Sequence, residues 1–407
     1  MNSDYHSDGT EVAASTKNPT NRWQKFLLIA PLLVISTGCG SNLSSVEEFG
    51  AGSTELITAS NAFAADIYAS CIRRLDFITR VPVTSNEADK ATNQTEKIRN
   101  ETRQQCIQEN QKVANQTKLV NQIPVDYMLA LGELAAKNPV DFSANINAIK
   151  QALNNLSIPT TRVDRETEQP LPPFTFNTTV VEAGSNILEF ITNQLTGQFQ
   201  KQKIKEAILC NNKPFHIYLT GEKPINNNDV GSSAVQQNGL VQLVDEVFVQ
   251  GYSEIEREEI STFYRTEIAQ IVAIQNRAVE QKNDLVNLKA IELLEYFRQA
   301  ANADDNLTQS RINSAIAYMD LLKRTAAAHN ELYQSFLTEE ERTITPEKIQ
   351  QRCPSPEDST EKLARKASDD VFQMSDAEFA KFQQSLTDFL IEVEPLFAQI
   401  DERFLTQ

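Results

Sequence analysis

The amino-acid sequence predicts an all-α protein, an elongated antiparallel helical bundle with long, coiled-coil-like helices and Pro-rich loops. Three observations indicate this class. Glycine accounts for 12 of 407 residues, about 3%, whereas soluble proteins average about 7%. Long stretches are rich in Ala, Leu, Glu, Gln, Lys and Arg, which are the stronger helix formers. Apolar residues recur at spacings of three and four, which places them on one face of a helix.

The N-terminal helical region is predicted to span residues 54–156. After its first helix comes a polar stretch with few apolar residues at helical spacing, and the part of this stretch before Ile98 fits either a helix or a loop. Pro124 and Pro139 are each expected to open a shorter helix, because proline is favoured in a first turn. The stripe of the first helix ends before Pro82 and consists of Ile57, Ser60, Ala64, Ile67, Cys71, Leu75 and Ile78.

Residues 157–176 contain four prolines and mixed charge, so they are predicted to form an extended Pro-rich linker. Residues 177–407 are predicted to form a C-terminal bundle of long helices. The first of these helices is expected to end near Cys210. An irregular segment follows, in which FHIYL, residues 215–219, fits either a short strand or a plug against the bundle.

Two long stretches of the C-terminal bundle carry apolar faces. From Gly239 to about Asn302 the pattern is helical, and Asp304 to Asn306 are expected to end it and to cap the next helix. The face of the first stretch is marked by Ile268, Ile271, Ala278, Leu285 and Leu288. The next stretch has the seam of an antiparallel bundle, formed by Ile312, Ala315, Met319, Leu322, Ala326, His329, Tyr333 and Phe336.

The last helix is predicted to begin with a capping box at Ser375 to Glu378. Pro395 is expected to bend this helix, because proline removes a backbone hydrogen bond. Its apolar seam consists of Phe379, Phe382, Leu386, Phe389, Val393, Leu396 and Ile400. Long helices with narrow seams must pack on one another or on a partner to bury them.

The net charge of −17 argues against nucleic acid as a partner, because no basic patch is available to meet phosphates. The sequence has neither a CxxC pair nor an HxxxH motif, so no metal or other cofactor is predicted. Asn226 to Gly231 is interpreted as a polar linker, since it lacks the spacing of a calcium loop.

No catalytic constellation is evident, and the sequence predicts a protein that is not an enzyme. His329 lies on an apolar seam and is interpreted as a packed histidine. His216 has no identifiable nucleophile or carboxylate partner. The helix from Val125 to Lys137 is apolar enough to suggest a hairpin that enters membranes, but Asp126 and Glu133 interrupt it, so core packing is favoured.

The segment FLLIAPLLVISTGCG, residues 26–40, is an apolar run that ends on a cysteine. Its apolar part, Phe26 to Ser36, is shorter than the roughly 20 residues needed to cross a bilayer. This length suits the apolar region of a signal peptide, and Arg22 and Lys25 precede it as the basic region should. The other interpretations are an ordinary signal peptide and a short core helix with a chance cysteine.

This segment resembles a bacterial lipoprotein signal peptide, with Ser36-Thr37-Gly38-Cys39 in the place of the lipobox. The resemblance implies cleavage between Gly38 and Cys39 and attachment of acyl chains, such as palmitate, to Cys39. Residues 1–38 would then be the signal peptide. Residues 39–53, mostly Gly, Ser and acidic, would be a flexible tether.

The resemblance also implies a location outside the cytosol, with the protein held on a membrane by lipid. Because residue 40 is Gly rather than Asp, the sorting rule of that family favours the outer membrane, facing the periplasm, in a bacterium with two membranes. Trp23 is the only tryptophan, so the mature chain would contain none.

Four cysteines remain beyond Cys39, and an exported protein can form disulfides between them. Cys71 and Cys106 face each other if the polar stretch between their helices is a hairpin loop. A tight turn at Pro82 would instead move them too far apart to bond. Cys210 and Cys353 form the remaining pair, and four buried free thiols are the alternative.

These features lead to one functional hypothesis and two alternatives. The protein is expected to be a lipid-anchored cell-envelope scaffold that acts through contacts with an envelope protein or with a second copy of itself, and through the bilayer by acylated Cys39. The first alternative is a helical membrane-acting protein of the pore-forming toxin type. The second, a ligand-binding lipoprotein, is disfavoured by the low glycine content and the missing βαβ pattern.

Overall fold

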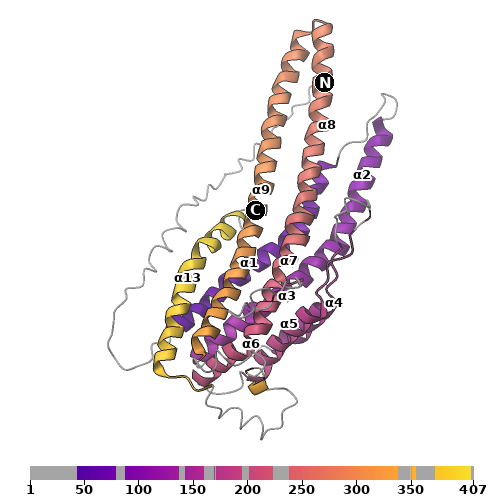
Figure 1. Cartoon of the computed structure of the whole chain (residues 1–407). Coiled ribbons are helices and arrows are strands. Elements are labelled where there is room, and N and C mark those ends of the chain that lie inside the picture. Colours follow the sequence, from indigo (N-terminus) through magenta and orange to yellow (C-terminus); the bar gives the residue numbers. More distant parts are fainter. Residues whose placement is uncertain are drawn as a thin grey trace, which may run out of the picture. The chain divides into compact units, whose positions relative to one another are not determined.

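The protein is all-α throughout the part of the chain that the computed structural model describes, which confirms the predicted fold class (Figure 1). The described residues are 44–78, 88–136, 143–159, 169, 171–194, 201–222, 238–337, 349, 351–353 and 372–404. The predicted signal peptide, with Gly38 and Cys39, lies outside them, as do the start of the predicted tether and Pro139.

The first two long helical segments pack against each other. Helix α1 (Ser44–Arg74) continues into a short 3₁₀ turn, η3 (Leu75–Phe77), and its predicted stripe is largely buried. The second segment is one continuous helix made of α2 (Ala88–Gln105), a π-helical turn η4 (Cys106–Asn110) and α3 (Gln111–Ala136).

Pro124 lies inside α3, so the prediction that it opens a helix is wrong. A proline has no N–H for the carbonyl four residues earlier, which here belongs to Val120. The hydroxyl of Tyr218 donates to that carbonyl at 2.7 Å. The helix continues through the proline because a side chain supplies the missing donor.

Three shorter helices follow: α4 (Ser143–Asn155), α5 (Thr178–Gln194) and α6 (Lys201–Thr220). Between α4 and α5, Ile158 and Phe174 exchange two backbone hydrogen bonds of 3.0 and 2.8 Å. Both side chains are buried in the main core. The described ends of the Pro-rich segment therefore pack on the bundle, and helices on either side of it share one core within the compact unit Asn42–Gln407.

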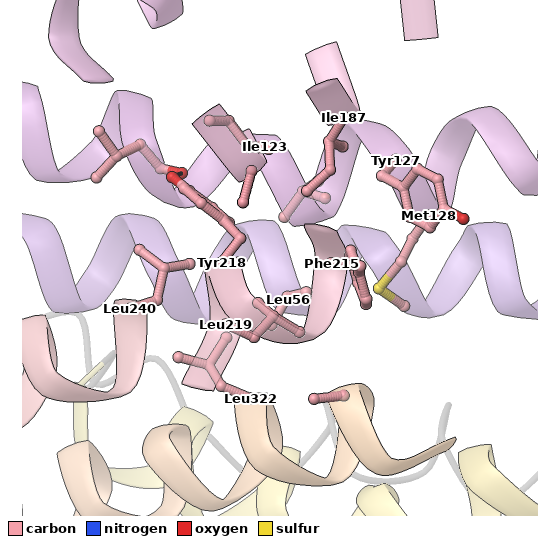
Figure 2. Close-up of a cluster of buried hydrophobic side chains, with 14 of the residues drawn as sticks. Leu56, Ile123, Tyr127, Met128, Ile187, Phe215, Tyr218, Leu219, Leu240 and Leu322 are labelled. Atoms are coloured by element: carbon pink, nitrogen blue, oxygen red, sulfur yellow. Dashed lines mark hydrogen bonds between the residues drawn. The ribbon is translucent and has the colours of Figure 1, made fainter. Parts of the chain in front are cut away.

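The segment FHIYL is helical, which corrects the expectation of an irregular segment with a short strand, and it packs against the bundle. Helix α6 runs past Cys210 and through Pro214 to Thr220. Phe215, Ile217, Tyr218 and Leu219 are all buried, and Figure 2 shows several of them in the core beside Leu56, Ile123 and Leu322. A helix that is apolar on nearly every side is stable where other helices surround it.

The longest helices form a hairpin. A short helix α7 (Leu240–Leu243) and a π-helical segment η5 (Val244–Tyr252) lead into α8 (Ser253–Glu280). After a three-residue turn, α9 (Asp284–Phe336) runs back beside α8 (Figure 1). The predicted break at Asp304 to Asn306 is wrong, because α9 is continuous there.

The real break at Gln281 to Asn283 is a Schellman motif. Asn283 N–H donates to the Ala278 carbonyl and Lys282 N–H to the Val279 carbonyl. Lys282 occupies the left-handed position, with φ of 52°, where glycine is usual. The side chain of Asn283 then caps α9 by accepting from Val286 N–H at 3.2 Å.

Helix α13 (Asp376–Phe404) packs on α9 and completes the main core. Its predicted capping box is confirmed, since Ser375 N–H donates to Glu378 at 2.7 Å and Glu378 N–H to Ser375 Oγ at 3.2 Å. Every member of its predicted seam except the half-buried Leu396 is buried, and so is every member of the α9 seam except the half-buried Met319.

Candidate functional site: the α8–α9 hairpin tip

A buried cluster of charges fixes the base of the α8–α9 hairpin. Arg73 on α1 donates to Asp66 at 2.8 Å and to Glu256 of α8 at 2.8 Å. Arg311 of α9 donates to the same carboxylate of Glu256 at 2.5 Å. Asp66, Glu256 and Arg311 are each less than 5% exposed. Two arginines face two carboxylates, so the charges balance, as burial of ions requires.

Burial lowers the pKa of both guanidinium groups, but their net pKa shifts differ in direction. Burial lowers the pKa of Arg311, although the nearby Glu256 opposes this shift. For Arg73, burial also lowers the pKa, but the hydrogen bonds to Glu256 and Asp66 outweigh it and raise the pKa overall. Arg73, which contacts both acids closely, is therefore the cation that their charges hold most firmly.

A second set of contacts lies beside this cluster. The hydroxyl of Tyr264 on α8 donates to Asp304 of α9, and Arg257 pairs with Asp305 at 3.1 Å. The ring of Tyr264 also lies 6.1 Å from that of Phe77, in the turn η3 that follows α1. The side chains of Asp304 and Asp305 thus bind side chains of α8 and do not cap a helix end. This agrees with the continuation of α9 through both residues.

Farther along, the hairpin has only a small core of its own. Ile271, Ala290 and Leu294 are buried together, with Ile268, Val272 and Phe297 packed around them. This cluster is separate from the main core. We call residues 274–298 the hairpin tip.

The hairpin tip carries a high density of exposed apolar side chains. Leu285 is 70% exposed and Tyr296 67%. Large apolar side chains more than a third exposed are Ile274, Val279, Leu285, Val286, Leu288, Ile291, Leu293 and Tyr296. The predicted face that includes Leu285 and Leu288 is therefore buried only at Ile271 and Ala278, with Ile268 half-buried.

The apolar character of the tip follows from the start of α9. Nine of the thirteen residues from Leu285 to Phe297 are apolar. At 3.6 residues per turn, they surround the helix, and α8 covers only the side of Ala290 and Leu294. A helix that is apolar on all sides is normally buried, so the tip has the composition of a covered element but is exposed in one chain.

The charge of the tip also differs from that of the rest of the chain. The whole chain has a net charge of −17, but residues 274–298 contain four basic and four acidic residues and are neutral. The basic residues are Arg277, Lys282, Lys289 and Arg298; the acidic residues are Glu280, Asp284, Glu292 and Glu295. A neutral apolar surface on an acidic protein is suited to a protein contact.

The structure bonds the four predicted cysteines in two disulfides. Cys71 joins Cys106 with Cα atoms 5.7 Å apart, and Cys210 joins Cys353 with Cα atoms 5.6 Å apart. Both pairings are confirmed, and the alternative of four free thiols is wrong; Pro82 lies outside the described residues. The first bond ties α1 to the π-helical turn η4, and the second ties α6 to a residue that precedes α13.

His329 is a packed histidine, as predicted. Its Nε2 lies 2.9 Å from the hydroxyl of Tyr127 and its Nδ1 lies 3.1 Å from Oδ1 of Asn212. The adjacent cavity has a volume of about 10 Å³, enough for one water molecule at most. This buried network holds helices together and has no room for a substrate.

His216 is half-buried near the end of α6. Its Nδ1 lies 2.9 Å from the carbonyl of Glu222 and 3.1 Å from the hydroxyl of Thr220. Burial lowers its pKa, which the Glu222 carbonyl opposes. These are the contacts of a histidine that closes a helix end.

The helix proposed as a membrane-entering candidate lies in the core. Val125, Tyr127, Met128 and Leu131 are buried, which agrees with core packing; Lys137 lies outside the described residues. No helix in the described ranges is long and apolar enough to cross a membrane.

Among the residues that the structure places, no group of three His, Cys, Asp or Glu is arranged to hold a metal ion. The segment Asn226 to Gly231 is outside that part of the chain.

Sequence reasoning missed the hairpin tip as a site. The spacing of Leu285 and Leu288 predicts only that they share an apolar helix face, whereas the apolar residues on all sides of 285–297 indicate a surface that one neighbouring helix cannot cover. Comparison with known proteins adds no assignment: no protein-family model, curated protein or solved structure matches the chain.

Proposed function

We propose that the protein is a lipid-anchored scaffold of the cell envelope, without catalytic activity, that acts through protein contacts at the hairpin tip. The observation that carries this proposal is the exposed apolar surface of residues 274–298, on a hairpin whose base is fixed by buried ion pairs. The lipobox-like sequence before Cys39 supports the anchor, because acyl chains on one cysteine hold a protein to a bilayer.

The membrane-acting alternative is less well supported by the same surface. Glu280, Lys282 and Asp284 flank or form the turn of the hairpin, so they would enter a bilayer first. A charged residue costs about 2.5–3.5 kcal/mol at the centre of a membrane-spanning helix. A protein partner that binds along the sides of the hairpin would bury the apolar residues and leave these charges in water.

The anchor is tested by the intact mass of the protein extracted from membranes of its own host. The expected mass is that of the chain from Cys39 with acyl chains added and four hydrogens fewer for two disulfides. The Cys39→Ser variant should lose the lipid and leave the membrane fraction. Recovery of the complete chain, including Trp23, from the soluble fraction would contradict the anchor.

The contact is tested in the same cells with a photo-crosslinking amino acid at position 288, in the hairpin tip. Position 323, an exposed lysine elsewhere on α9, is the matched control. We expect protein adducts from position 288 and few from position 323. Adducts with lipid alone, together with dye release from liposomes by the purified protein, would favour the membrane-acting alternative.

A further inference from the structure

We propose that the hairpin tip binds a second copy of this chain, through antiparallel pairing of the two α9 helices across a two-fold axis between Ala290 and Ile291. The inference rests on the proposed function, because both use the same surface, and it names the partner. Three features of the tip support it: the residues on one face of α9, their order along the helix, and the charge of the surrounding protein.

The face in question points away from α8. Ala290 and Leu294 pack on α8 in the small core of the hairpin. On the opposite side, within an arc of about 100° at 3.6 residues per turn, lie Leu285, Leu288, Lys289, Glu292 and Tyr296. All five are exposed. Lys289 and Glu292 pair at 2.7 Å within the helix, with two-thirds of each side chain exposed.

The order of these residues is self-complementary. A two-fold axis requires that one surface match its own copy when the helix direction is reversed. With the axis between Ala290 and Ile291, Leu285 faces the partner's Tyr296. Lys289 faces the partner's Glu292, and symmetry makes this pair twice. Apolar residues thus meet apolar residues, and each charge meets its opposite.

The charge distribution favours the tip as the place where two copies meet. Two chains of net charge −17 repel each other over most of their surface, and the neutral segment 274–298 avoids that repulsion. The apolar residues of the pairing face, Leu285, Leu288 and Tyr296, are 70%, 58% and 67% exposed, so pairing would bury apolar surface that one chain leaves in water. Two α8–α9 hairpins would together form a four-helix bundle, in which each α9 is covered on two sides.

The test is a charge exchange in the full protein, extracted from membranes in detergent and measured by light scattering with the detergent mass subtracted. The wild-type protein should have twice the protein mass of one chain. Lys289→Glu and Glu292→Lys should each be monomeric, since each places like charges opposite each other. An equal mixture of the two variants should restore the dimer, because each then supplies the charge that the other lacks.

The mixing step excludes a structural explanation within one chain. Both variants break the Lys289–Glu292 pair of their own helix, so mixing can restore only a contact between copies.

The double variant Leu285→Glu, Leu288→Glu should raise the Kd of the dimer at least about 100-fold. Its helicity and melting temperature should be unchanged, because both side chains are already exposed. The matched control is Lys323→Glu, which should leave the dimer unchanged.

Other outcomes overturn the proposal in distinguishable ways. A wild-type protein that is monomeric at every concentration, but crosslinks from position 288 to a different envelope protein, would refute self-association and retain the proposed function. A dimer that survives the Leu285 and Leu288 substitutions, or a mixture that stays monomeric, would refute this interface. Monomers that show no protein adduct from position 288 would refute both.

Discussion

The hydroxyl of Tyr218 on α6 donates to the backbone carbonyl of Val120 on α3, at 2.7 Å. This carbonyl is the one that Pro124 leaves without its helical donor. The tyrosine is fully buried, and burial raises the pKa of its hydroxyl well above the ordinary value, so it remains a donor at every physiological pH. A side chain from one helix therefore completes the backbone hydrogen bonding of another.

Tyr218→Phe should destabilise the protein by about 1–3 kcal/mol, because it leaves a buried carbonyl without a partner. The free energy of unfolding in urea, followed by circular dichroism, measures the loss. In a Pro124→Ala background the same substitution should cost less, since the alanine N–H can donate to Val120. An equal cost in both backgrounds would show that the hydroxyl does not compensate for the proline.

The ion pair between Glu256 and Arg311 leads to a second prediction. Glu256→Gln removes the carboxylate that both Arg311 and Arg73 contact, so buried positive charge is left without compensation. We expect a loss of about 3–5 kcal/mol in the free energy of unfolding. The control is Asp305→Asn, which breaks the exposed pair with Arg257 and should cost about 1 kcal/mol or less. Similar losses in both variants would mean that the cluster does not stabilise the hairpin base.

Spacing alone predicted the seams of α9 and α13, because their apolar residues are buried by neighbours that repeat the same period. Where the described part of the chain supplies no neighbour, spacing does not predict burial. Leu285 and Leu288 have the spacing of a packed face but are 70% and 58% exposed. Periodicity identifies which residues share a face; it does not identify what covers that face.

The other errors arose from tertiary contacts between distant parts of the chain. Asp304 is of a type that caps helices, but Tyr264 binds its side chain and α9 continues. Lys282 ends α8 in a position that glycine usually fills, so no glycine marked the turn. Pro124 suggested a helix start because the donor from Tyr218 cannot be inferred from local sequence. The disulfide pairs were predictable because a hairpin loop between the first two helices would place Cys71 opposite Cys106, which leaves Cys210 and Cys353 as the second pair.

Asp126 should make the protein less stable at neutral pH than at mildly acidic pH. Burial raises its pKa from 3.8 to about 6, and the hydrogen bond from Gln122 opposes this. A raised pKa in the folded state means that the folded protein binds the proton more tightly. The stabilisation is complete below the unfolded pKa and is lost as the pH rises from about 4 through 6.

The direction of this pH dependence is tested with Asp126→Asn, whose side chain does not titrate. The variant should be more stable than the wild-type protein at pH 7.5, by up to about 3 kcal/mol, and the difference should shrink towards pH 4. Urea unfolding at each pH measures it. A constant difference over this range would show that Asp126 does not have a raised pKa.

His329 should have the opposite dependence. Burial lowers its pKa from 6.5 to about 3, and the nearby His216 adds to this. The ring contacts Asn212 Oδ1 through Nδ1 and the hydroxyl of Tyr127 through Nε2, and that hydroxyl donates to the Ala207 carbonyl. Because the folded pKa is depressed, the stabilising effect of the neutral ring is present above pH 6.5 and is lost as the pH falls towards 3.

Between pH 7.5 and pH 5, the wild-type protein should lose about 2 kcal/mol more of its free energy of unfolding than His329→Gln, which has no titrating ring. The same urea titrations measure this change, and the Asp126→Asn series is the control, since its difference from wild type must change in the opposite direction. A His329→Gln protein whose stability falls with acid as steeply as that of the wild type would show that the buried imidazole is not what the acid attacks.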